Sequence, residues 1–426
     1  MTFRNTDTDF DIAIAGGGLV GAALACALGE TSLRIGLFDS RCFESASIPC
    51  NGESLVFDAR VSAIAPSSRR LLEQAGAWPF ITAKRLSPYT DMEVWDAEGT
   101  GSIHFSADDI HESCLGYIIE NSVILAGLYR RLEQISSVSV ICPAEVKTIQ
   151  RLEETPRGVM KITGSRAGEE QSWTSTLLVG ADGPASRIRQ LAGFQTREWE
   201  YQHEAIVTTV RTELPHRATA LQRFMSSGPL AFLPLCTGDG ESQDRDRYCS
   251  IVWSLVPERA AEIMDLEDTQ FARLLAREIE HRLGKIEWVD RRFVFPLWQR
   301  HAVDYVQPNI VLVGDAAHTI HPLAGQGVNL GFRDVEELTR QIQGAIDRRR
   351  HFAEMPALRA YQRARKTHNL HMMGVMEGFK FLFAQNALPV RWLRNAGMSG
   401  IDQAGFIKNR LMREAMGVRI SDGLGN

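Results

Sequence analysis

Residues 11–39, DIAIAGGGLVGAALACALGETSLRIGLFD, constrain the fold more strongly than any other stretch of the chain. A short apolar run at 12–15 predicts a buried parallel strand, and glycines with the spacing GxGxxG follow it at 16–21. An alanine-rich helical stretch at 22–28 then leads to a second mostly apolar run at 33–38. This order of strand, glycine loop, helix and strand predicts a βαβ unit of a Rossmann-like sheet.

The glycine loop and the end of the second strand carry the groups that a dinucleotide needs. Gly16 permits a tight turn, Gly18 lets the backbone approach a pyrophosphate, and Gly21 lets the helix pack closely on the strand. The start of the helix offers N–H groups and a positive dipole end to phosphates. Asp39, 18 residues after Gly21, can accept hydrogen bonds from a ribose diol. We therefore predict dinucleotide binding by Gly16, Gly18, Leu19, Val20, Gly21 and Asp39.

A membrane-spanning helix is the competing interpretation of this stretch. Residues 12–29 are 18 long and carry no charge, which is the length at which a spanning helix begins. However, three consecutive glycines at 16–18 interrupt the helical period, and the Ile/Ala alternation at 12–15 fits a strand better. A soluble βαβ unit is the better prediction.

The composition narrows the class of protein. A chain of 426 residues has room for two or three domains, and 44% hydrophobic with 23% charged residues is typical of soluble proteins. The net charge of −5 argues against a nucleic-acid partner. Seven cysteines, odd in number and without CxxC spacing, indicate neither a disulfide framework nor a zinc site, so we expect a reducing compartment. The polar start MTFRNTDTDFD predicts no signal peptide, and we expect a cytoplasmic protein.

The pattern of a buried strand followed by a loop returns twice. A strand predicted at 176–180 is followed by Ala-Asp-Gly, with the acid at Asp182, and a strand predicted at 309–314 leads into a loop at 315–327. Ligands of open α/β sheets bind at such carboxyl ends of parallel strands. Residues 194–300 alternate as in an antiparallel sheet, and 357–417 are mostly helical, basic and rich in Met and Phe.

The loop at 315–327, DAAHTIHPLAGQG, allows two kinds of site. Asp315, His318 and His321 have a spacing that metal ligation permits, but no further cluster of ligands stands out in the sequence. We therefore predict no metal and interpret the segment as a cofactor loop. Asp315 can accept from a ribityl hydroxyl, and the glycines on either side of Gln326 let backbone lie against a flavin ring. The positive N-terminus of the helix that follows would favour an anionic reduced ring.

The three motifs, in this order, resemble the fingerprints of the single-component flavin-dependent aromatic hydroxylases, the family that includes p-hydroxybenzoate hydroxylase. Five further segments resemble the ubiquinone-biosynthesis hydroxylases of the UbiH/UbiF/VisC type. They read DAR at 58–60, LGYIIEN at 115–121, YQRAR at 361–365, LRNAG at 393–397 and KNRLMREAMG at 408–417. The resemblance covers essentially the whole chain.

The resemblance implies roles for individual residues. Asp39, where many relatives carry Glu, would bind the adenosine half of FAD with the glycine loop, and Asp182 would lie near the FAD and the approach of the pyridine nucleotide. Arg60, which could otherwise be a surface cation, would touch the pyrophosphate and ribityl region together with Asn121. The implied cofactor-binding residues are Gly16, Gly18, Leu19, Val20, Gly21, Asp39, Arg60, Asn121, Asp182, Gly314, Asp315, Gly325, Gln326, Gly327, Val328 and Asn329.

Two residues of the loop are the catalytic candidates. Pro322 would line the flavin ring, together with the backbone around Val328 and Asn329. His321 is interpreted either as a structural histidine or as a group that assists deprotonation of a phenol.

The predicted fold is α/β, with a Rossmann-like FAD-binding domain, a second β-sheet substrate domain and a helical C-terminal region. We place the discontinuous FAD-binding domain at 1–85, 110–193 and 300–346. The β-rich substrate domain takes 86–109 and 194–299, and the helical region takes 347–426.

The implied activity is that of an FAD-dependent monooxygenase. It would hydroxylate the aromatic ring of a polyprenylphenol in ubiquinone biosynthesis through a C4a-hydroperoxyflavin, with O₂ and NAD(P)H or another electron donor as co-substrates. The chain has one full dinucleotide fingerprint, so NAD(P)H would bind transiently on the FAD scaffold. An FAD-dependent polyprenyl-lipid reductase and a non-catalytic flavin-binding subunit stay open as alternatives. Three kinds of interaction also stay open: binding of other ubiquinone-biosynthesis proteins, formation of a homo-oligomer, and peripheral contact with the inner membrane.

The segment 368–387, HNLHMMGVMEGFKFLFAQNA, is the most apolar part of the C-terminal region. Its apolar residues crowd more than one helical face, which is typical of a helix packed on the body of a protein. Met and Phe also suit an apolar entry channel for a polyprenyl tail, or a contact surface for a partner protein or a membrane. Basic neighbours could meet anionic headgroups, and they are Arg359, Arg363, Arg365, Lys366, Arg391 and Arg394.

Overall fold

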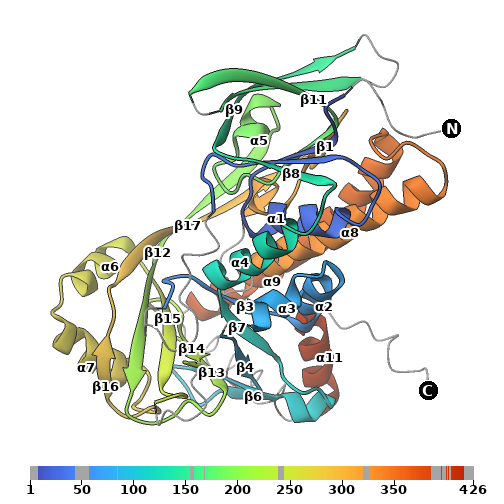
Figure 1. Cartoon of the computed structure of the whole chain (residues 1–426). Coiled ribbons are helices and arrows are strands. Elements are labelled where there is room, and N and C mark those ends of the chain that lie inside the picture. Colours follow the sequence, from blue (N-terminus) through green and yellow to red (C-terminus); the bar gives the residue numbers. More distant parts are fainter. Residues whose placement is uncertain are drawn as a thin grey trace.

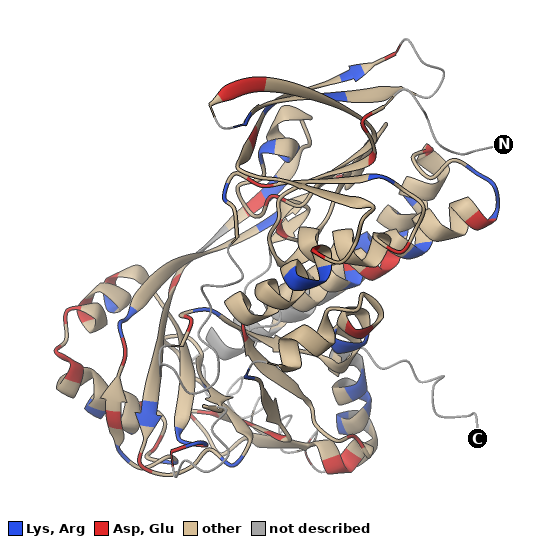
Figure 2. Ribbon diagram, viewed as in Figure 1, with Lys and Arg blue, Asp and Glu red and all other residues tan. Residues whose placement is uncertain are grey.

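A computed structural model describes residues 8–43, 57–83, 85–153, 158–166, 168–237, 244–319, 327–384, 395, 400, 402 and 404–416. Two β-sheet parts are joined by long strands that run from one part to the other (Figure 1). Figure 2 shows Lys and Arg interspersed with Asp and Glu along the described ribbon of both parts.

The first sheet is built on the predicted βαβ unit. Its main path has the order β18-β19-β11-β1-β2-β8, and the neighbours from β19 to β8 pair in parallel. Strands β9 and β10 extend it as an antiparallel meander beside β11. The strands are β1 (Phe10–Ala15), β2 (Ile35–Phe38), β8 (Val138–Ile141), β9 (Ala144–Leu152), β10 (Val159–Arg166), β11 (Glu169–Gly180), β18 (Val306–Gln307) and β19 (Ile310–Leu312).

Four helices pack side by side next to this sheet (Figure 1). They are α1 (Leu19–Leu28), α4 (Asn121–Leu132), α8 (Gly327–Asp347) and α9 (Met355–Ala384). Helix α1 is mostly buried because its Ala-rich sequence lets it contact β1, α4 and α8 at close range. A short helix, α5 (Arg187–Leu191), follows β11 and contacts it.

The second sheet has nine strands in the described residues, with the main order β20-β17-β12-β15-β14-β13-β5-β6 and β16 beside β12. It is antiparallel as predicted, except that β13 pairs with β5 in parallel. Helices α6 (Pro257–Met264) and α7 (Asp268–Glu278) share its core with Trp95, Phe232 and Trp253. The strands are β5 (Asp91–Asp96), β6 (Ser102–Ser106), β12 (Thr196–Thr212), β13 (Thr219–Phe224), β14 (Leu230–Leu235), β15 (Tyr248–Leu255), β16 (Ile286–Val289), β17 (Phe293–Ala302) and β20 (His318–Thr319).

A small third sheet of three strands accompanies the two larger sheets. It has the order β3-β7-β4, from β3 (Val61–Ile64), β7 (Gly116–Glu120) and β4 (Ser87–Tyr89). Strand β3 leads into α2 (Pro66–Gln74), which has Pro66 in its first turn, where proline is well tolerated. Helix α3 (Trp78–Thr82) follows.

The described residues of the C-terminal region are mostly helical, as predicted. Helix α11 (Gly405–Met416) places Met412 and Met416 against Ala107, Ile110 and Leu115. Within the described part of the chain, no helix combines the length and the apolar character that crossing a membrane requires.

The predicted fold class is confirmed: a Rossmann-like sheet, a second β-sheet and a helical C-terminal region are all present. The exact domain boundaries stay a prediction. The second sheet takes strands from β5 and β6 as well as from β12 to β17, so its segments are far apart in sequence.

Candidate active site

The glycine loop lies at the carboxyl end of β1, and each of its glycines meets different surroundings. Gly16 has a φ of +108°, and a Cβ there would lie 2.4 Å from the Ala181 carbonyl oxygen. A Cβ at Gly21 would lie 1.9 Å from the carbonyl oxygen of Gly16. In contrast, a Cβ at Gly18 would meet no atom of the described part of the chain within 4 Å. The first and last glycines are therefore required by the protein, whereas Gly18 borders open space that a ligand can enter.

The start of α1 supplies hydrogen-bond donors to this open space. The first hydrogen bond within the helix is donated by the Ala22 N–H to the Gly18 carbonyl oxygen, at 2.9 Å. The earlier N–H groups of the turn have no acceptor within the helix, and the first turn holds no acidic residue. Such a helix N-terminus favours an anionic group.

Asp39 lies next to the same loop. One carboxylate oxygen accepts from the Gly17 N–H at 2.7 Å, and the other accepts from the Arg41 N–H at 2.8 Å. Tyr129 also holds this loop, because its hydroxyl donates to the Gly17 carbonyl oxygen at 3.1 Å. The half-buried carboxylate retains lone pairs that a ribose diol can approach.

The three sequence motifs touch one another. The Ala181 backbone packs on Gly16, as the Cβ distance above requires. Val20 packs between Gly314 and Gly331, where added Cβ atoms would lie 3.1 Å and 2.5 Å from its side chain. Arg189, from α5, donates to the Ala316 carbonyl oxygen at 2.9 Å. Residues separated by some 300 positions in sequence therefore form one contiguous site.

Asp182 holds its own loop together. Its carboxylate accepts from the Ser186 hydroxyl at 2.5 Å and from the N–H groups of Arg187 and Ile188 at 2.7 and 3.0 Å. These bonds cap the start of α5. A contact of Asp182 with FAD or a pyridine nucleotide stays a prediction.

Arg60 and Asn121 are joined through the start of α4. The Asn121 N–H donates to the Arg60 carbonyl oxygen at 3.0 Å, and the Asn121 side-chain oxygen accepts from Ser62 at 2.6 Å. Asp58 accepts from the N–H groups of Arg60 and Ser122 at 3.2 and 3.1 Å, so it fixes this turn on the helix. The exposed Arg60 guanidinium lies 5.9 Å from the centre of the Phe295 ring.

Asp315 lies just after β19, and its charge interacts with that of Arg60. Loss of hydration beside the surrounding protein raises the pKa of Asp315 above its ordinary value, while the electrostatic attraction of His318 and Arg60 opposes the rise. The side chain is nevertheless accessible to solvent, and water limits the rise. We therefore expect an ionised carboxylate that can accept hydrogen bonds from a ligand hydroxyl.

The buried side chain of Asn329 makes three hydrogen bonds to other protein groups. Its oxygen accepts from the Ala65 N–H at 3.0 Å and from the Ser68 hydroxyl at 2.7 Å, and its amide donates to the Ala63 carbonyl oxygen at 2.7 Å. Asn329 therefore ties the first turn of α8 to the segment from β3 to α2. Val328 and Gly327 precede it in that turn, and a Cβ at Gly327 would meet no atom of the described residues within 4 Å. A flavin contact by this backbone stays a prediction.

The remaining predicted site residues, His321, Pro322, Gly325 and Gln326, lie outside the described residues. The proposed catalytic and ring-lining roles of His321 and Pro322 therefore stay predictions.

His318 contacts a residue that the sequence patterns missed. Its Nε2 lies 2.5 Å from a carboxylate oxygen of Asp334, which also accepts from the Gly314 N–H at 2.9 Å. Arg365 from α9 completes the group, with Nε 2.7 Å from the other oxygen of Asp334. The spacing of Asp334 within a helix gave no signal of this role, because its partners come from other elements.

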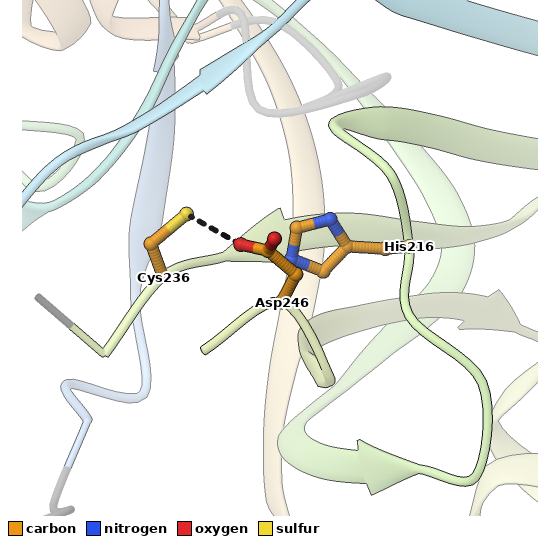
Figure 3. Close-up of side chains that lie close together, drawn as sticks. All are labelled: His216, Cys236 and Asp246. Atoms are coloured by element: carbon orange, nitrogen blue, oxygen red, sulfur yellow. Dashed lines mark hydrogen bonds between the residues drawn. The ribbon is translucent and has the colours of Figure 1, made fainter. Parts of the chain in front are cut away.

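One group of three potential metal ligands occurs in the described part of the chain, and it lies in the second sheet part: His216, Cys236 and Asp246 (Figure 3). The sequence patterns missed it because the three residues are on separate segments. Both ring nitrogens of His216 are already hydrogen bonded, to the Leu235 carbonyl oxygen and to the Ala218 N–H, each at 3.1 Å. Burial lowers the pKa of His216 and raises the pKa of Cys236. A metal would have to displace an existing bond, so the group is interpreted as a structural polar cluster.

The residues present fit FAD. An open glycine loop at a helix N-terminus suits the pyrophosphate, Asp39 suits the ribose, and the Arg60–Asp315 pair suits the polar chain between pyrophosphate and flavin ring. The family described as an FAD binding domain matches residues 9–373. The chain belongs to this family.

Two curated relatives of this FAD-binding chain are named a hydroxylase and a monooxygenase. The 3-demethoxyubiquinol 3-hydroxylase of Escherichia coli K12 is 34% identical, over 97% of this chain and 100% of the relative. The human mitochondrial ubiquinone biosynthesis monooxygenase COQ6 is 32% identical, over 96% of this chain and 92% of the relative. The resemblance derived from the motifs is confirmed, and the chain is a member of the FAD-dependent aromatic monooxygenases.

The fold agrees with solved structures. The crystal structure of p-nitrophenol 4-monooxygenase PnpA from Pseudomonas putida DLL-E4 superposes with a TM-score of 0.74, covering 95% of this chain and 98% of that one. At 17% sequence identity, this similarity concerns the fold alone.

Proposed function

We propose that this FAD-dependent monooxygenase hydroxylates the aromatic ring of a polyprenylphenol lipid in ubiquinone biosynthesis. The observation that carries the proposal is the similarity over nearly the whole length to two proteins named for hydroxylation in that pathway. The joining of the three flavin motifs into one site supports it.

Each part of the site would hold one part of FAD. The N–H groups at the start of α1 would bind the pyrophosphate, Asp39 the adenosine ribose, and Asp315 with Arg60 the ribityl region. When bound and reduced by NAD(P)H or another donor, FAD supplies the activation of O₂ and the transfer of one oxygen atom. The task of the chain is to orient the flavin against the ring of the substrate and to keep water away from the reaction.

Isotope incorporation tests the reaction class. We expect protein supplied with ¹⁸O₂, an electron donor and a polyprenylphenol to place one ¹⁸O atom in the hydroxylated product, with the other atom leaving as water. A reductase of polyprenyl lipids would convert its substrate without ¹⁸O, and a non-catalytic subunit would give no product. Either of these results, obtained with flavin-loaded protein, contradicts the proposal.

We further propose that the apolar segment 368–387 admits the polyprenyl tail. This proposal rests on the sequence, because the side chains of Phe379 and Phe383 lie outside the described part of α9. Peripheral contact with a membrane, in a cytoplasmic protein, is a related proposal for the same region.

Phe379→Glu or Phe383→Glu is expected to reduce kcat/KM for a long-tailed phenol at least tenfold and to leave a short-tailed phenol within about threefold, with FAD retained. The reason is that a carboxylate in an apolar tail channel costs binding energy that a short substrate never uses. Ala364→Glu, on an exposed position of the same helix, is the control and should change neither value. Equal loss for both substrates, or loss of FAD, would mean that the segment is only core.

A further inference from the structure

Asp334 is a fully buried carboxylate, 0% exposed, on α8. One of its oxygens takes two donors, the Gly314 N–H at 2.9 Å and His318 Nε2 at 2.5 Å. The other oxygen accepts from Arg365 Nε at 2.7 Å. Burial alone would raise the pKa of Asp334, but His318 and Arg365 outweigh it and hold the pKa below its ordinary value. The site therefore contains an ionised, fully bonded carboxylate.

The two donors on one side of Asp334 bracket Asp315. Gly314 and His318 stand at the two ends of the short turn that presents Asp315. Gly314 has a φ of +59°, and the Ala317 N–H closes the turn on the Gly314 carbonyl oxygen at 2.9 Å. The carboxylate of Asp334 thus restrains both ends of the turn, while the Asp315 side chain itself stays accessible.

The donor on the other side of Asp334 begins a chain of buried polar contacts. Arg365 donates to the Asn369 oxygen at 2.9 Å, and Asn369 donates to the Tyr305 hydroxyl at 3.2 Å. Tyr305 donates in turn to His301 Nε2 at 2.9 Å, since burial lowers the pKa of His301 to about 4 and keeps the ring neutral. His301 lies opposite His318 in the antiparallel pairing of β17 with β20.

Stability alone is a weak reason for such a group. Replacing a buried ionic triad by apolar side chains of similar volume often leaves a protein as stable, because desolvation offsets the attraction between the charges. The group instead gives the turn a defined geometry. The three donors to Asp334 stand at fixed positions, and these positions allow only one arrangement of the turn.

We propose that Asp334, held by Arg365, is a positioning residue for FAD binding: it acts through the Gly314–His318 turn and sets the place of the Asp315 carboxylate. This role is independent of the proposed substrate, because it concerns the affinity of the protein for FAD and holds whichever lipid is hydroxylated.

FAD titration of the apoprotein tests this role. We expect Asp334→Asn to lower FAD affinity at least tenfold, measured by quenching of flavin fluorescence, while apoprotein still unfolds cooperatively on heating. Asp315→Ala, which removes the proposed contact itself, should also lower affinity at least tenfold. Asp347→Asn, an exposed position near the end of α8, is the matched control and should leave affinity unchanged.

The double variant separates positioning from general destabilisation. If Asp334 acts through Asp315, then Asp334→Asn combined with Asp315→Ala should bind FAD within about threefold of Asp315→Ala alone. Fold changes that multiply would mean that the two residues act independently, and they would overturn the proposal. An FAD affinity of Asp334→Asn within twofold of the unmodified protein would overturn it as well.

A second pair of variants covers a failure of Asp334→Asn to fold. His318→Gln removes one donor from the turn and leaves the Arg365–Asp334 pair intact, so it should reproduce the loss of FAD affinity. Arg365→Lys, which keeps the charge, should lose less affinity than Arg365→Met. If none of these variants yields folded apoprotein, the group serves the fold itself and the positioning role is rejected.

Discussion

Gly18→Val is expected to lower FAD affinity at least a hundredfold, about 2.8 kcal/mol, while the apoprotein stays folded. Gly18 has an extended backbone, with φ −70° and ψ −172°, that valine can adopt. Among the residues that the structure describes, no atom lies within 4 Å of a Cβ there, so we expect the valine methyl groups to occupy the space predicted for the pyrophosphate. Flavin fluorescence titration gives the affinity, and thermal unfolding of the apoprotein gives the stability.

Gly21→Ala is the informative comparison, because it is a smaller change with the opposite expected outcome. Its Cβ would lie 1.9 Å from the Gly16 carbonyl oxygen, so the helix would have to move away from the strand. We expect a lower apoprotein melting temperature or no soluble protein. If Gly18→Val binds FAD within threefold of the unmodified protein, the pyrophosphate does not lie on Gly18.

Asn329→Ala is expected to lower the free energy of unfolding by about 3 kcal/mol or more. The substitution leaves two buried donors, the Ala65 N–H and the Ser68 hydroxyl, and one buried acceptor, the Ala63 carbonyl oxygen, without their partner. Each such loss typically costs about 1–3 kcal/mol. Urea unfolding of apoprotein, followed by tryptophan fluorescence, measures the change directly.

Gln343→Ala is the matched control on the same helix. Gln343 is exposed and donates to Asp347 at 2.8 Å at the surface, so its loss should stay within about 0.5 kcal/mol. An equally small effect of Asn329→Ala would show that water or a shifted side chain replaces its three bonds. FAD titration of the same variants would then show whether the tie between α8 and β3 matters for the cofactor.

The βαβ unit, the flavin motifs and the fold class could be predicted from the sequence because their signals are local. The GxGxxG spacing depends on contacts within one turn, and Gly21 meets Gly16 only five residues away. A buried parallel strand likewise shows itself as a continuous apolar run, as in β1 and β19. Motifs of this kind also carried the family resemblance that the relatives confirm.

Where the sequence pattern was incomplete, the missing information was pairing between distant segments. The run at 115–121 leads into α4, and Gly116–Glu120 within it forms the central strand of a small sheet because β3 and β4 supply its hydrogen bonds, which no local pattern indicates. The parallel pairing of β13 with β5 inside an antiparallel sheet has the same origin, since Asp91 of β5 lies 128 residues before its partner Thr219.

The sequence by itself determined where the cofactor motifs are and which βαβ unit starts the fold, because glycine spacing and apolar runs act over a few residues. Only the tertiary structure decided how those motifs are held together. Val20 between Gly314 and Gly331, and Asp334 with Arg365, are contacts between elements whose helical or loop positions look ordinary in sequence. A buried charge has no local signature, since its cost and its compensation both depend on donors that folding brings from other segments.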